Sequence, residues 1–171
     1  MLVRLGAEAR IVRTPSDLAG LDALVLPGGE STTMTLGIER EGLAGPLREL
    51  IAEGTPVLAT CAGMIVLDRD PLDVLDLSTR RNACGRQVMS FEADLSLPDL
   101  GETPVTAVFI RAPWVEEHGP DVEVLAEIDG HPVAVRQGEV TAVAFHPELT
   151  GDDRLHRRLI DAVGARTKEH A

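Results

Sequence analysis

The segment 56–64, PVLATCAGM, places one of the chain's two cysteines at an apparent tight turn between a strand and a helix. Small residues flank Cys61, as in a nucleophile elbow, where a sharp turn presents the side chain at the carboxyl end of a sheet. A helix N-terminus behind the sulfur favours the reactive thiolate, and its backbone N–H groups can receive an oxyanion. The alternative is a small buried hydrophobic residue, the commonest role of a free cysteine. The elbow alone leaves both open.

Of the five histidines, His146 is the best candidate for a catalytic base. It ends the strand-like run 140–146 and begins the sequence His146-Pro147-Glu148. Residues two apart in an extended chain point the same way, so Glu148 can lie beside the imidazole and orient it. Together with Cys61 these residues would form a Cys-His-Glu triad. The alternative is a histidine at a strand end with a chance acidic neighbour.

The other four histidines fit a catalytic role less well. We expect them on solvated loops, on the polar side of the last helix and beside the C-terminus: His118 and His131, His156, and His170, respectively.

A glycine-rich loop at 27–33, PGGESTT, follows a short apolar run. Two glycines after a strand let the backbone approach a ligand closely and direct amides at it. No lysine follows the glycines, so the loop is not a phosphate-binding loop of the Walker type. Taken alone, this pattern usually marks only a turn.

In the first half of the chain, predicted strands alternate with predicted helices, and these elements must position the residues above. Strands are predicted at 8–12, 22–26 and 56–59, with a helix at 46–53 that ends at Gly54 and another from Ala62. Such alternation is typical of a parallel, doubly wound sheet.

The second half is richer in strand-like runs, at 91–97, 105–111, 122–128, 132–137 and 140–146. Asp129-Gly130 predicts a hairpin between two of them. A last helix at 152–163 would bury Leu155, Leu159 and Val163. We therefore predict a single α/β domain over residues 1–171, an open, doubly wound, mostly parallel sheet flanked by helices, with an antiparallel extension in its second half.

Composition narrows the class of function. The net charge is −12, with 28 acidic and 16 basic residues, which argues against binding nucleic acid or an anionic membrane. The two cysteines make no disulfide framework, and no Cys/His cluster has the spacing of a metal site. No apolar run is long enough to span a membrane, and the N-terminus does not resemble a signal peptide. A cytoplasmic enzyme or binding domain fits best.

The segments PGGEST, ATCAG and FHPE together resemble those of class I, triad-type glutamine amidotransferases. Three further segments, 81–95, 108–117 and 133–138, resemble the glutaminase subunit of pyridoxal 5′-phosphate synthase. RN-x-x-GRQ-x-x-SFEA and FIRAP are the most specific motifs, and the resemblance runs through nearly the whole chain.

The resemblance implies roles for particular residues. Cys61 would be the nucleophile, His146 the base and Glu148 the residue that orients it. Glutamine would be bound by residues of the first loop, by one later arginine and by the pair that ends FIR: Gly29, Glu30, Ser31, Arg81, Ile110 and Arg111. For Arg81 and Arg111, structural ion pairs are the alternative, and Cys84 is expected to serve packing.

The resemblance implies neither cofactor nor metal. Ammonia would pass to a (β/α)8-barrel synthase subunit in a large hetero-oligomer, which builds pyridoxal 5′-phosphate from a pentose phosphate and a triose phosphate.

One departure from the family concerns the start of the chain. Met1 aligns near the end of the family's first helix, so we expect one β-α unit to be absent, leaving core surface and strand-edge hydrogen bonds uncovered. We expect such a chain to be less stable and less active than a longer form.

Two other functions remain as alternatives. One is a cysteine hydrolase of the wider elbow-bearing superfamily, against which His146-Pro147-Glu148 argues. The other is a non-catalytic subunit that docks on the synthase, against which the complete set of triad residues argues.

Overall fold

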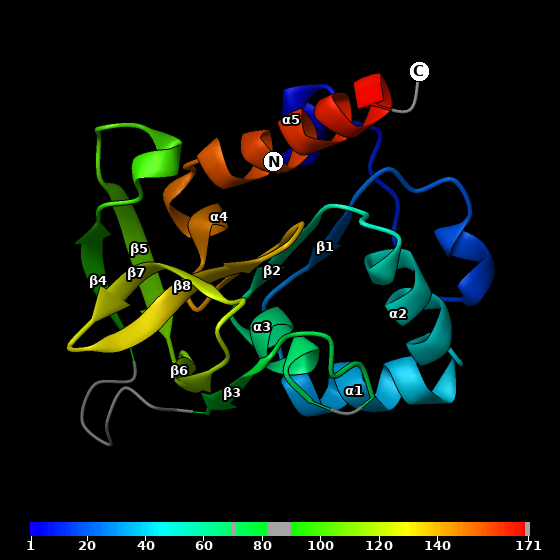
Figure 1. The fold of residues 1–171 in the computed structure, drawn as a ribbon, viewed down its shortest axis with the longest axis horizontal. Helices are drawn as coiled ribbons and strands as arrows, with labels where there is room; N and C mark the ends of the chain where they lie inside the picture. The colour runs from blue at the N-terminus through cyan, green and yellow to red at the C-terminus, as the bar shows by residue number, and fades with distance from the viewer. Residues whose placement is uncertain (70, 82–89, 170–171) are drawn as a thin grey trace.

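The computed structural model describes residues 1–69, 71–81 and 90–169 (Figure 1). Within them, a five-stranded sheet has the order β1-β2-β9-β8-β7. Its parallel part consists of β1 (Leu24–Leu26), β2 (Val57–Thr60) and β9 (Val140–Val143). The strands β8 (His131–Gln137) and β7 (Glu123–Ile128) continue it in antiparallel pairing. The predicted α/β fold with an antiparallel extension is confirmed.

The strand β2, the middle one of the three parallel strands, is buried along its whole length. Helix α3 (Ala62–Leu67) follows it directly, contacts β1, β2 and β9, and buries all of its residues. Helix α5 (Arg154–Glu169) contacts β2 and lies on the opposite side of it from α3 in Figure 1. A strand covered on both faces must be apolar at every position, which explains the run Val57-Leu58-Ala59.

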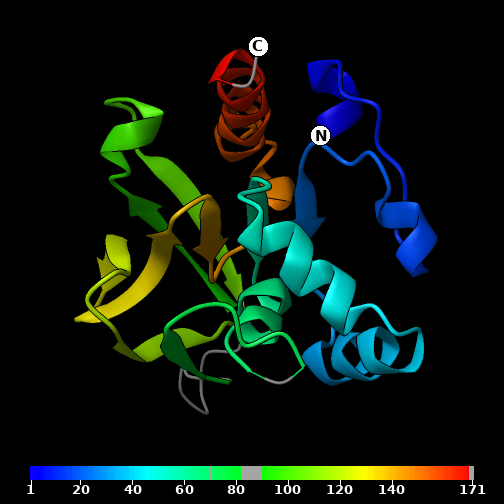
Figure 2. The same ribbon diagram turned by 45° about the vertical axis from the view of Figure 1, so that its right-hand side comes forward.

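Two helices join β1 to β2. Helix α2 (Ala44–Ala52) contains most of the predicted helix, and Gly54 follows it with φ 79°, the left-handed conformation that ends a helix. Helix α1 (Ser31–Arg40) was not predicted, because the loop 27–33 suggested only a turn. In Figure 2, α1 and α2 follow one another at an angle and lie on the side of the molecule away from the antiparallel strands.

Two antiparallel strand pairs stand beside the main sheet. β3 (Leu77–Arg80) pairs with β6 (Trp114–His118), and β4 (Ser90–Leu95) pairs with β5 (Val105–Ile110). The rings of Phe91 in β4 and Phe109 in β5 stack with their centroids 4.6 Å apart and stabilise this pair. Phe109 also meets Phe145 edge to face at 5.7 Å, which ties β5 to the chain that follows β9.

The predicted hairpin is confirmed between β7 and β8. Asp129 and Gly130 have φ of 52° and 78°, the positive values that a type I′ turn requires at both central positions.

The strand predicted at 8–12 is wrong. This segment forms no strand, and the side chain of Ile11 is 73% exposed. A strand needs a partner, and among the described residues the edge of β1 away from β2 pairs with no other strand. A groove of about 1130 Å³ lies there, lined by apolar residues from both segments and from α1 and α5, among them Ala9, Ile11, Leu24, Leu26, Ile38 and Val163.

Candidate active site

Cys61 occupies a strained turn between β2 and α3. Its backbone has φ 48° and ψ −106°, a conformation that side chains rarely adopt. Its N–H donates to the carbonyl of Val143 at 2.8 Å, which fixes the turn to β9. The chain passes so close to β1 that a Cβ on Gly63 would lie 2.1 Å from the carbonyl oxygen of Leu26. Glycine at position 63, which has no Cβ, is therefore a steric requirement of the elbow.

His146 lies between Cys61 and Glu148. Its Nδ1 is 2.7 Å from Oε1 of Glu148. The hydrogen bond with the Cys61 thiol and then that with Glu148 raise the pKa of His146 to about 10. Burial would raise the pKa of Glu148, but the hydrogen bond from His146 helps to hold it below its ordinary value. At neutral pH the imidazole is therefore charged, with the Glu148 carboxylate on one side of it and the Cys61 side chain on the other.

The position of His146 is set from two sides. Its N–H donates to the carbonyl of Val108 in β5 at 2.9 Å, and Pro147 then begins the short helix α4 (Pro147–Thr150). The sequence argument assumed that Glu148 lies in extended chain, whereas it lies in the first turn of α4. The helical turn still brings its carboxylate to the imidazole.

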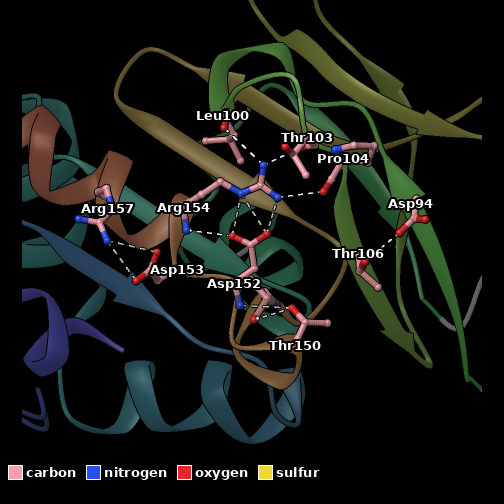
Figure 3. Close-up of polar contacts among 11 residues, drawn as sticks. Asp94, Leu100, Thr103, Pro104, Thr106, Thr150, Asp152, Asp153, Arg154 and Arg157 are labelled. Atoms are coloured by element: carbon pink, nitrogen blue, oxygen red, sulfur yellow. Dashed lines mark hydrogen bonds and ion pairs between the residues drawn. The ribbon is translucent and has the colours of Figure 1, made fainter.

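An arginine clamp holds the end of α4 in place (Figure 3). Arg154 pairs with Asp152 at 2.6 Å, and its guanidinium donates to the carbonyls of Thr103 and Pro104 at 2.6 and 2.9 Å. These carbonyls precede β5, the strand that also binds the N–H of His146. The chain is therefore joined to β5 and the residues before it on both sides of Glu148, at His146 by its N–H and after α4 by Arg154.

Gly28 packs directly against the catalytic candidates. A Cβ at this position would lie 2.5 Å from Cε1 of His146 and 3.5 Å from Cβ of Cys61. Its N–H donates to the hydroxyl of Thr60 at 3.0 Å. Sequence reasoning noted two glycines in this loop but singled out only Gly29, because nothing in the sequence places His146 beside the first.

The other loop residues serve the start of α1. The carboxylate of Glu30 accepts hydrogen bonds from the backbone N–H of Thr33 and Thr32, at 2.8 and 3.1 Å. These bonds lower the pKa of Glu30 to about 2. Ser31 is buried, and Gly29 has φ 150°, where a side chain would be strained. The Glu30 carboxylate therefore builds the loop, and its contact with a ligand would come from the backbone.

The remaining glutamine-binding candidates approach from two other elements. Nη1 of Arg81, just after β3, donates to the hydroxyl of Thr32 at 3.1 Å. The Cys61 thiol lies 4.0 Å from the carbonyl oxygen of Ile110, at the end of β5. Arg111 follows with φ 45° and an exposed side chain. The loop after β1 and the end of β5 thus meet at the cysteine, and Arg81 reaches the first turn of α1, which follows that loop.

Three histidine predictions are wrong, although His118, which ends β6, is exposed as expected. His156 does not lie on a polar surface: it is 7% exposed, its Nδ1 has no hydrogen-bond partner, and burial lowers its pKa. Helix α5 contacts β2 and two other segments of the chain, so His156 is covered as well as the apolar positions Leu155 and Leu159. His131 lies in β8, where its ring stacks on Trp114 at 3.8 Å.

Within residues 1–69, 71–81 and 90–169, no group of three or more His, Cys, Asp or Glu side chains could hold a metal ion. In the same residues, no helix has the length and apolar character to cross a membrane. Cys84, predicted to serve packing, lies outside the described residues, as does much of the motif at 81–95.

Known families and structures share this architecture. A sequence model described as the SNO glutamine amidotransferase family matches residues 1–164. A solved structure described as a glutamine amidotransferase superposes with a TM-score of 0.87 at 45% identity, covering 95% of this chain and 90% of that one. A putative GMP synthase subunit from Thermoplasma acidophilum shares the fold, with a TM-score of 0.72 at 20% identity, over 99% of this chain and 87% of that one.

Two curated relatives are similar over most of their length. One is the pyridoxal 5′-phosphate synthase subunit PdxT of Mycolicibacterium vanbaalenii, 54% identical over 167 residues, which cover 91% of this chain and 85% of that protein. The other is the subunit of the same name from Corynebacterium jeikeium, 52% identical over 176 residues, covering 97% and 90%.

Proposed function

Because the chain belongs to the SNO glutamine amidotransferase family, we propose that Cys61, His146 and Glu148 are the triad with which it hydrolyses glutamine to glutamate and ammonia. The observation that carries this assignment is the 2.7 Å contact between His146 and Glu148, together with the packing of His146 and Cys61 around Gly28, where an added Cβ would lie 2.5 Å from Cε1 of His146 and 3.5 Å from Cβ of Cys61. The strained elbow that presents the sulfur supports it.

The reaction follows from these contacts. The Cys61 thiolate adds to the side-chain amide carbon of glutamine, and the oxyanion that forms accepts hydrogen bonds from backbone N–H groups of the elbow and of the glycine loop. The His146 imidazolium gives its proton to the departing amine, so ammonia leaves and a thioester remains. Neutral His146 then takes a proton from water, whose oxygen attacks the thioester. Glutamate leaves, and the thiolate and imidazolium are restored.

The backbone N–H groups that would bind the oxyanion can be chosen by excluding those that already have another acceptor. The N–H of Gly28 is bound to Thr60, and the N–H of Cys61 is bound to Val143. We therefore assign the oxyanion to the N–H groups of Gly29 and Ala62. Gly29 has the unusual backbone conformation that lets a peptide turn toward a ligand.

Glutamine binding is assigned to residues around the elbow. Arg81 would pair with the substrate carboxylate, since a guanidinium matches a carboxylate in two-pronged geometry. The backbone around Ile110 and the exposed Arg111 would contact the other end of the amino acid. The loop residues Gly29, Glu30 and Ser31 complete the site.

The curated relatives are named as subunits of pyridoxal 5′-phosphate synthase. We therefore propose that this chain forms a single glutaminase domain that works in the cytoplasm with a synthase subunit. That partner would be a (β/α)8 barrel in a large hetero-oligomer, and it would consume the ammonia. The chain's net charge of −12 supports a protein partner over nucleic acid or an anionic membrane.

The test is glutamate release from glutamine, with and without the synthase subunit of the same organism, beside a Cys61→Ala variant. We expect release that the partner increases and that the variant abolishes. Release that persists in Cys61→Ala would refute the triad. Binding to the partner without release in the unmodified chain would favour a docking subunit that has no glutaminase activity.

A further inference from the structure

A polar cluster lies at the end of α3 opposite Cys61, formed by Asp68, Arg69 and Thr79. Asp68 follows the last residue of α3, and its side chain is 1% exposed. Its Oδ1 accepts from Nε of Arg69 at 2.7 Å, and its Oδ2 accepts from the backbone N–H of Thr79. A buried carboxylate is costly unless it is paired and hydrogen-bonded, and here both of its oxygens have partners.

Arg69 completes the hold on Thr79. Its Nη2 donates to the Thr79 carbonyl and to the Thr79 hydroxyl, both at 3.0 Å. Thr79 is therefore bound at its N–H, its carbonyl and its side chain. The pairing of β3 with β6 is irregular between Ser78 and Thr79, so the cluster fixes β3 where its strand ladder is interrupted.

The cluster lies between two parts of the proposed site. At one end of α3 is Cys61, and at the other is Asp68. Arg81 comes two residues after Thr79, and its guanidinium reaches across to Thr32 of α1. One buried helix thus connects the nucleophile with the point where the chain bearing Arg81 is fastened.

We propose that Asp68 is a positioning residue for glutamine binding: together with Arg69 it fixes Thr79, and thereby sets Arg81 at the correct distance from Cys61. This inference rests on the proposed role of Arg81 in binding the substrate carboxylate. A guanidinium that must be ordered at each binding event binds more weakly than a preorganised one. The reacting atoms are held by other contacts, so loss of the cluster should weaken binding more than chemistry.

The test is a double-mutant cycle on the complex with the synthase subunit. Asp68→Asn keeps the shape of the side chain but replaces an acceptor with an N–H₂ group that faces donors. We expect the KM for glutamine to rise about 5-fold to 10-fold with kcat within about 2-fold, and Arg81→Ala to raise KM by about 10-fold or more. In the Arg81→Ala background, Asp68→Asn should add no further increase.

Two controls separate positioning from a general loss of structure. Asp121→Asn changes the same functional group at an exposed turn and should leave both constants unchanged. The rate at which iodoacetamide alkylates Cys61 should also be the same in Asp68→Asn as in the unmodified protein. If Asp68→Asn does not fold, Arg69→Gln replaces it, because it removes the contacts with Thr79 from a side chain that is 39% exposed.

The possible results are distinct. An unchanged KM in Asp68→Asn, or the same increase in the presence and absence of Arg81, would overturn the inference while leaving the triad intact. An unchanged KM in Arg81→Ala would overturn both the inference and the proposed role of Arg81. Glutamate release that survives Cys61→Ala would instead refute the proposed catalytic function itself.

Discussion

Replacing Gly28 with alanine should damage catalysis through a single methyl group. The new Cβ would lie 2.5 Å from Cε1 and 3.0 Å from Nδ1 of His146, whereas carbon atoms in ordinary contact are about 3.5 to 4.0 Å apart. The imidazole must therefore move by about 1 Å. It cannot do so freely, because Nδ1 is bound to Glu148 and the backbone N–H to Val108.

The size of the effect follows from that displacement. A misplacement of about 1 Å in a catalytic group can cost about 100-fold in rate, and forcing a methyl group into a packed site costs about 1 to 3 kcal/mol of stability. We expect kcat for glutamate release to fall by about 100-fold while KM changes little, because the clash is with His146 and not with the binding candidates. The backbone at Gly28 is not in the left-handed region, so the effect isolates the added side chain.

The assay is steady-state glutamate release by the complex, with unfolding followed separately by circular dichroism. Gly37→Ala is the matched control, since a Cβ there meets nothing within 4 Å and alanine favours the interior of α1. Its kcat should be unchanged. A Gly28→Ala variant that keeps kcat within about 3-fold would show that His146 is not held as described, and would refute the reasoning.

Three further predictions concern charge. Glu148→Gln removes one of the bonds that raise the pKa of His146 to about 10. The basic limb of the pH profile of kcat/KM should therefore move to lower pH, and kcat should fall by about 100-fold. A basic limb that does not move would contradict the role assigned to Glu148. His156 has a pKa below its ordinary 6.5 because it is buried, so the unfolded chain takes up its proton first and stability is lost as pH falls below 6.5. His156→Gln should make the drop in Tm between pH 7 and pH 5 smaller, and an equal drop would argue against this titration. Arg154→Ala should lower the unfolding free energy by about 2 kcal/mol in urea titrations, because it leaves Asp152 and several carbonyls without their partner (Figure 3). The control Arg157→Ala breaks an exposed pair with Asp153 and should lower it by about 0.5 kcal/mol or less. Equal losses in the two variants would refute the clamp.

The sequence was most informative where chemistry depends on local pattern. The run before Cys61 and the small residues around it predicted β2, the elbow and α3, because a strand buried on both faces and a sharp turn each restrict residue types at adjacent positions. Asp129-Gly130 predicted its hairpin for the same reason. Such features are decided within a few residues.

The predictions that were wrong or missed depend on contacts between residues far apart in the sequence. The segment 8–12 has the composition of a strand, but a strand exists only if another lies beside it. His156 follows the rule for a polar helix face, yet it is covered because α5 meets several elements at once. The contact of Gly28 with His146 joins residues far apart in the sequence, and no local signal announces it.

The antiparallel half is more than an appendage to the parallel sheet. Of the residues assigned to the reaction, Cys61 and Gly29 follow parallel strands, where ligands of open α/β sheets are usually bound. The antiparallel strands contribute the carbonyl of Val108 that holds His146, the carbonyl of Ile110 beside the thiol, and the end of β3 that carries Arg81. In the proposed mechanism the elbow by itself supplies only the sulfur. If these assignments hold, binding of the substrate and placement of the base depend on the added strands. Substitutions that loosen β3 or β5 should then change glutamine turnover before they unfold the five-stranded sheet.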